Sequence, residues 1–162
     1  MNGIMDYFGQ NFGFSWRGLL AAGLLMLPNL LFAVRSPKSM PANLQSAGAA
    51  VEILENGSRI ATLAGFVLLT KQGHGSPLFL GLGLAALTPY YGMWIRYFFT
   101  NRPFASLFTE KFWGMPLPMA VFPVLFFFFM ALWLESLPLV GIIAVFGVCH
   151  LWNSYATLKQ LQ

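Results

Sequence analysis

Two carboxylates, an amide and a guanidinium lie close together in one short stretch of this chain, at Glu52, Glu55, Asn56 and Arg59. On a helix, residues four and seven apart share a face, so both carboxylates would lie along the face of the guanidinium, with the amide beside them. Two neighbouring carboxylates could act as a general acid–base pair. However, the chain has no GxSxG, HExxH or P-loop motif, and no GxGxxG between a strand and a helix. We therefore expect no enzyme activity, no catalytic residue, no cofactor and no metal site, and we interpret the stretch as a polar cluster.

Three more polar residues, Asn29, Arg96 and His150, interrupt apolar stretches elsewhere in the chain. If these stretches cross a membrane, all three fall in the same half of the bilayer as Arg59. One hypothesis is a single buried or water-lined polar cluster, because ionisable residues inside a membrane often mark a functional site. The alternative is that Arg96 and the glutamates lie at the interface and extend to the headgroups, and that His150 is a packing residue.

The elements that position these residues must be helices in a membrane. Apolar residues make up 57% of the chain and charged residues 9%, with a mean hydropathy of +0.67. A soluble domain carries roughly 25% charged residues, so the solvent for most of this chain is lipid. The apolar runs are continuous rather than alternating, which predicts helices. We expect one all-α helical bundle over residues 1–162, with no nucleic-acid partner, because the basic residues flank hydrophobic segments.

Five apolar segments are candidates for crossing the bilayer, which takes about 20 helical residues. They are approximately residues 14–34, 51–70, 78–100, 119–134 and 139–158. The second has the shortest uncharged stretch, because only Ile60 to Thr70 separate Arg59 from Lys71. A full crossing requires a helix that begins near Ala50 and draws the polar cluster towards the membrane. The alternative is four spans plus one re-entrant or interfacial helix.

The distribution of basic residues favours five spans. With five crossings, Arg17 and Lys71 lie on one side, and the other side collects most of the basic residues: Arg35, Lys38, Arg96, Arg102, Lys111 and Lys159. The positive-inside rule then predicts an external N-terminus and a cytoplasmic C-terminus. If the second segment does not cross, this charge bias nearly disappears.

Small residues recur at four-residue spacing in the second segment, at Gly57, Ala61 and Gly65. Such a stripe lets two helices approach closely, so it predicts a helix-packing face. The packing could be against a second copy of this chain or another membrane protein. The ordinary frequency of glycine in membrane helices explains the same pattern equally well.

Four short pieces, in this order, resemble an uncharacterised bacterial family of small multi-pass membrane proteins. The pieces are residues 28–33, residues 52–55 followed by Arg59, residues 90–98, and residues 146–150 with Tyr155. They touch four of the five segments, and the chain differs from the family pattern at Ser58, where a glycine is expected. The resemblance implies a bundle of about five spans in a bacterial inner membrane and implies no activity.

Two functions remain open for such a protein. The first is a non-enzymatic membrane accessory protein that docks a partner through its small-residue stripe. The second is a subunit of a transporter or channel for a small solute or protons, in which the polar cluster lines a cavity on the cytoplasmic half. A lipid-modifying enzyme is a weaker third possibility, because no catalytic set is recognisable.

Overall fold

The structure is a computed structural model, and it describes residues 6, 11–35, 41, 43–70, 75–100 and 103–162. Regular structure in this part of the chain is helical, which confirms the all-α prediction. The helices are α2 (Trp16–Val34), α3 (Ala49–Leu68), α4 (Pro77–Phe99), α5 (Ser106–Thr109), α6 (Pro118–Trp133) and α7 (Leu137–Gln160). Of the residues used above, Lys38, Lys71 and Arg102 lie outside the described residues.

Three helices in the described part of the chain, α2, α4 and α7, are long and apolar enough to cross a membrane. Helix α6 is apolar but has 16 residues, a length of about 24 Å at 1.5 Å per residue. Helix α3 has 20 residues and carries Glu52, Glu55 and Arg59. Length and composition therefore support a membrane-type helical bundle, and the five crossings stay a prediction.

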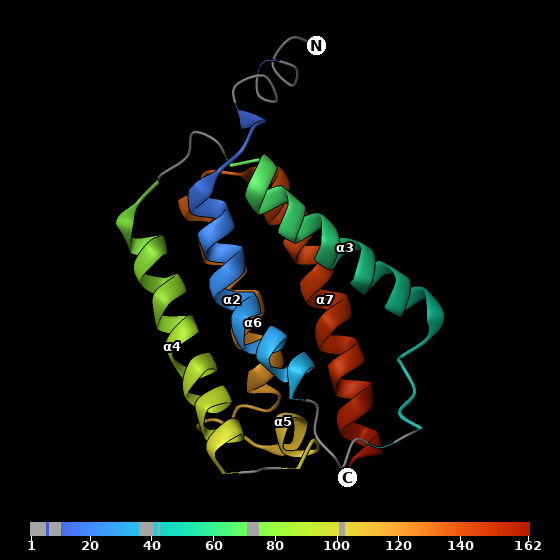
Figure 1. Ribbon diagram of the computed structural model, residues 1–162. Coiled ribbons are helices and arrows are strands. Elements are labelled where there is room, and N and C mark those ends of the chain that lie inside the picture. Colours follow the sequence, from blue (N-terminus) through green and yellow to red (C-terminus); the bar gives the residue numbers. More distant parts are fainter. Residues whose placement is uncertain (1–5, 7–10, 36–40, 42, 71–74, 101–102) are drawn as a thin grey trace.

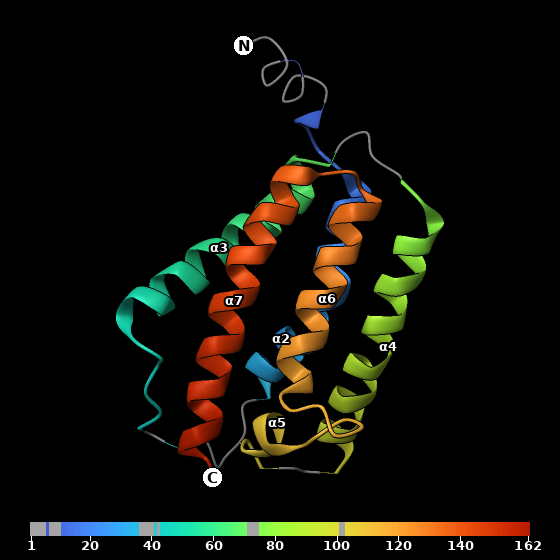
Figure 2. The same cartoon turned by 180° about the vertical axis from the view of Figure 1, so that it is seen from behind.

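The long helices run between two ends of the bundle and alternate in direction (Figure 1). One end holds the starts of α2, α4 and α7 together with the end of α3. The other, which we call the α5 end, holds α5, the start of α6 and the ends of α2, α4 and α7 (Figure 2). Helix α4 packs mainly on α6, and α3 packs mainly on α7. The core between them is largely aromatic and branched aliphatic, with Phe66, Tyr90, Phe126, Phe127, Leu139 and Ile143 fully buried.

Helix α3 is inclined to its neighbours, and its first half leans away from α2 (Figure 1). The chain before it continues along α7 to the α5 end. There the backbone N–H of Gln45 donates to Gln160 Oε1 (2.9 Å), and Gln160 Nε2 donates back to the carbonyl of Gln45 (2.7 Å). At the opposite end, the N–H groups of Gly13 and Ser15 each donate at 2.8 Å to carbonyls in the last turn of α3. The segment from Gln45 through α3 therefore joins the two ends of the bundle.

Helices α2 and α3 cross at very short distance near the start of α2. A Cβ atom added to Gly18 would lie 1.7 Å from the backbone oxygen of Phe66, so a residue without a side chain is required there. Ser15 caps the same helix, with its hydroxyl accepting from the N–H of Gly18 at 3.2 Å. These contacts hold the second half of α3 against α2. The side-chain contacts of its first half, such as that of Glu55 with His150, are made with α7.

Pro28 lies inside α2 and opens its backbone. A proline has no N–H, so the carbonyl four residues earlier loses its helical partner. That carbonyl, of Leu24, accepts a hydrogen bond from the Tyr91 hydroxyl of α4. A neighbouring helix thus satisfies the group that the proline frees.

Candidate functional site

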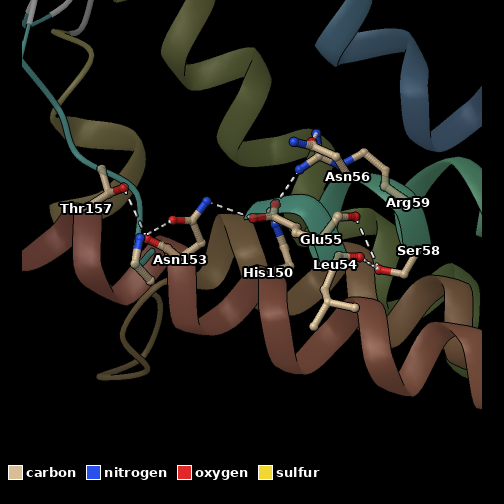
Figure 3. Close-up of polar contacts among 9 residues, drawn as sticks. Leu54, Glu55, Asn56, Ser58, Arg59, His150, Asn153 and Thr157 are labelled. Atoms are coloured by element: carbon tan, nitrogen blue, oxygen red, sulfur yellow. Dashed lines mark hydrogen bonds and ion pairs between the residues drawn. The ribbon is translucent and has the colours of Figure 1, made fainter. Parts of the chain in front are cut away.

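The centre of the polar cluster is the carboxylate of Glu55, which is 4% exposed. Its Oε1 lies 2.9 Å from Nδ1 of His150, and its Oε2 accepts a hydrogen bond from Nδ2 of Asn153 at 2.8 Å. Arg59, one turn along α3, forms an ion pair with Oε1. Figure 3 shows these side chains meeting between α3 and α7. A buried carboxylate requires such partners, because leaving it unpaired costs several kcal/mol or more.

Arg59 extends from this ion pair towards the middle of the bundle. Its side chain is 39% exposed, its NH1 donates to Asn56 Oδ1 at 3.4 Å, and its guanidinium carbon lies 5.9 Å from the ring centre of Phe146. The His150 ring stacks on the same phenylalanine, with the ring centres 5.1 Å apart and the planes at 17°. One aromatic ring therefore supports both the arginine and the histidine.

Asn153 is part of the cluster and was not among the predicted site residues. Besides holding Glu55, it accepts a hydrogen bond through Oδ1 from the backbone N–H of Ala47 at 2.9 Å. It therefore joins three segments, namely α7, α3 and the chain that precedes α3. The available signal was its position three residues after His150, which places both side chains on one face of a helix.

Asn29 belongs to a second polar group, between α2 and α4. Its Nδ2 donates to the hydroxyl of Tyr90 at 2.8 Å and to the carbonyl of Leu25 at 3.2 Å. Tyr90 is 2% exposed, so this group lies in the core of the bundle.

A cavity of about 320 Å³ connects the two polar groups. Its polar lining consists of Asn29, Arg59, Tyr90, His150 and Ser154. Apart from the indole N–H of Trp94, the remaining lining is apolar and comes from α2, α4, the α5 segment, α6 and α7: Leu25, Met26, Phe32, Trp94, Phe104, Leu107, Phe108, Leu117, Met119, Ala120, Pro123, Phe127 and Phe146. Glu55 does not line the cavity, and it contacts the lining residues Arg59 and His150. The tertiary structure thus brings Asn29, Arg59 and His150 to the wall of one cavity.

Two predicted members, Glu52 and Arg96, lie outside the cluster. Arg96 is on the last turn of α4, off the face that Tyr90, Trp94 and Tyr97 bury. Its side chain is 58% exposed, and its NH1 lies 3.6 Å from Glu110 Oε2. Glu52 is exposed because it lies in the first turn of α3, where the helix leans away from its neighbours. Helical spacing places Glu52 and Glu55 on similar sides of α3, but it does not show which of the two is close enough to α7 to be buried.

The small-residue stripe of α3 is divided between two environments. A Cβ at Gly65 would lie 2.7 Å from Cδ1 of Leu139, so Gly65 allows close packing of α3 on α7 within the chain. Ala61 is half-buried. A Cβ at Gly57 would meet no atom among the described residues, and Gly57 lies on the outward side.

The geometry of His150 determines how it can act. A ring nitrogen that hydrogen-bonds a carboxylate oxygen does so as a donor, so Nδ1 donates to Glu55 Oε1. In the described part of the chain, no three His, Cys, Asp or Glu side chains come together as a metal site. The arrangement can bind a solute through one cation, hydrogen-bonding groups and an aromatic wall.

Comparison with known proteins adds no further assignment, so the family resemblance stays a prediction. No family model, curated protein or solved structure matches this chain.

Proposed function

We propose that all five long helices cross a bacterial inner membrane, with the N-terminus outside and the C-terminus in the cytoplasm. The alternating helix directions support this topology, since the segment from Gln45 to Leu68 joins the two ends of the bundle. The distribution of charge also supports it. Arg35, Arg96, Lys111 and Lys159 lie at or next to the α5 end, and Arg17 lies in the first turn of α2 at the other end. The pairing of Glu55 with Arg59 lowers the cost of placing α3 in lipid.

Accessibility of single cysteines tests this topology. Ser46 and Ser76, which flank α3, are both exposed, and the native Cys149 is buried and would be replaced by alanine. A membrane-impermeant maleimide added to intact cells is expected to label Ser76→Cys and not Ser46→Cys, and to label both after the membrane is permeabilised. Labelling of both in intact cells, or of neither, would show that α3 does not cross.

We further propose that the protein binds a small solute in the cavity beside the polar cluster, as a subunit of a transporter or channel. The observation that carries this proposal is the position of Arg59. It is the one formally charged residue among the described residues that line the cavity, and a buried glutamate holds it there. An ionisable group at such a place inside a bundle marks a pathway or binding site more often than a structural contact. Five spans are few for a transporter, so we expect a homo-oligomer.

Filling the cavity tests solute binding. Ala120 is 5% exposed and lines the cavity, so Ala120→Leu would occupy it, whereas Ala85 is exposed on α4 and Ala85→Leu is a matched control. The purified protein would be heated with small amphiphilic and aromatic solutes. A solute at 100 times its Kd stabilises the folded state by about 2.7 kcal/mol. We expect this stabilisation in the wild type and in Ala85→Leu but not in Ala120→Leu; equal stabilisation in all three, or none in any, contradicts the proposal.

The outward face of α3 supports a second candidate function, docking of a membrane partner. Ile53 and Ile60 are 71% and 69% exposed, and Gly57 lies between them on the same helical face. Gly57→Leu is expected to reduce co-purification of a partner. Gly81→Leu is the control, because a Cβ there would also meet no atom among the described residues. An unchanged set of co-purified proteins in Gly57→Leu would count against docking. Gly65→Leu does not test it, since it would disrupt packing on Leu139.

A further inference from the structure

We propose that the cavity takes a monoanionic amphiphile, namely a carboxylate on a small apolar body, with Arg59 as its counter-ion. This inference rests on the proposed solute-binding function and names the chemical class of the solute. It follows from the charge, the hydrogen-bonding groups and the shape of the wall.

The wall of the cavity is positive at one place and carries no opposing charge among the described residues. Arg59 lines the cavity, whereas the Glu55 carboxylate is 4% exposed and has both oxygens bound, to His150 and Asn153. A guanidinium has five N–H donors. The contacts to Glu55 and Asn56 involve NH2 and NH1, so donors remain for a second acceptor. An anionic head is therefore favoured over a cationic one.

The limited positive charge favours a single negative charge on the solute. Arg59 already shares its charge with Glu55, and no second arginine or lysine is among the described residues that line the cavity, so a dianion such as a phosphate monoester is less well matched. The other polar side chains that line the wall are the hydrogen-bonding groups of Asn29, Tyr90, His150 and Ser154. A carboxylate matches this set, because a guanidinium binds it through two parallel hydrogen bonds.

The rest of the cavity is suited to an apolar body. Its walls include the rings of Phe32, Phe104, Phe108 and Phe127, which offer apolar surface and no charge. The volume of about 320 Å³ is near the lower limit for cavities that hold drug-sized molecules, about 300–1,000 Å³. The body must therefore be short or compact.

Three probes with one body and different heads test the assignment. Octanoate, octan-1-ol and octylamine would be titrated by calorimetry into the protein in phosphatidylcholine nanodiscs. We expect the wild type to bind octanoate at least about tenfold more tightly than the other two, the ratio that one hydrogen-bonded charge typically supplies. Arg59→Gln is expected to lower octanoate affinity to that of octanol. Arg96→Gln removes the same charge from an exposed site paired with Glu110 and is expected to change nothing.

Two further carboxylates identify the source of the solute. Tighter binding of decanoate than of benzoate would assign the site to a short fatty acid from the membrane, and the reverse would assign it to a water-soluble aromatic acid. Either result keeps the carboxylate head.

The outcomes that contradict this inference differ from those that contradict the proposed function. Equal binding of octanoate and octanol by the wild type, or unchanged octanoate binding by Arg59→Gln, overturns the anionic head and leaves solute binding in place. Binding of all three probes that Ala120→Leu does not weaken overturns both. If Arg59→Gln does not fold, the comparison of heads on the wild type and on Ala120→Leu still decides the question.

Discussion

Asn153 holds two parts of the polar cluster together, and its place in the sequence does not indicate this role. Its amide holds Glu55 Oε2 on one side and the N–H of Ala47 on the other, at 2.8 and 2.9 Å. Removal of the amide takes this partner from Oε2 of Glu55, a residue that is 4% exposed, and a buried polar group left unpaired costs about 1–3 kcal/mol. The residue thus links the carboxylate to the path of the chain before α3.

Asn153→Ala is therefore expected to lower the free energy of unfolding by about 1–3 kcal/mol, measured by reversible unfolding in mixed micelles. Thr88→Ala is the control. Thr88 is exposed, and its hydroxyl donates to Leu84 O within its own helix, so its loss should cost no more than about 0.5 kcal/mol. Equal effects of the two substitutions would show that Asn153 does not support Glu55.

At this scale the sequence predicted part of the cluster. The spacing along one helix placed Glu52 and Glu55 on the face of Arg59, and of the two carboxylates Glu55 forms the ion pair. The contact of Glu55 with His150 joins residues 95 apart in the chain, and local spacing contains no information on it. The same limit applies to Glu52, which shares the helix but is exposed.

At the scale of elements, the crossing of α2 and α3 controls where the polar cluster lies. Gly18 brings the backbones of these helices into contact near the end of α3. Helix α3 packs mainly on α7, and its first turns diverge from the bundle (Figure 2). A larger residue at the crossing would separate the two helices and change the inclination that brings Glu55 to His150.

Two glycines in α2 offer a matched comparison of this effect. Gly18→Ala is expected to destabilise the fold by about 1–3 kcal/mol, the usual cost of overpacking. A Cβ at Gly23 would meet no atom among the described residues, so Gly23→Ala is expected to be neutral or to stabilise by up to about 1 kcal/mol through helix propensity. Thermal unfolding of both variants checks this, and equal melting temperatures would contradict the close crossing.

For the whole molecule, the outer surface is the strongest sign of a lipid environment. Val34 and Phe99 are each 84% exposed, and Leu30 and Leu78 are 60% and 64% exposed. These side chains are distributed over α2 and α4, and with the outward isoleucines of α3 they form an apolar exterior on several sides. Scattered apolar exposure is normal in soluble proteins, but a charged fraction of 9% leaves too few charges to cover such a surface.

The chain is therefore expected to stay in the membrane pellet after an alkaline carbonate wash, which removes proteins bound only at the surface. Its release would require detergent, because lipid-exposed helices have no favourable environment in water. A soluble peripheral protein is the control for the wash. Recovery of this chain in the carbonate supernatant would contradict a membrane-spanning bundle.

The sequence by itself determined the helical class, the approximate limits of the apolar segments and the pairing of Glu55 with Arg59, because these depend on composition and on contacts within one helix. Only the tertiary structure decided that α3 leans on α7, that His150 and Asn153 complete the carboxylate site, and that Asn29 faces the same cavity. The physical reason is that these contacts depend on how helices cross. A crossing is set by close approach at positions such as Gly18, which hydrophobic periodicity does not encode.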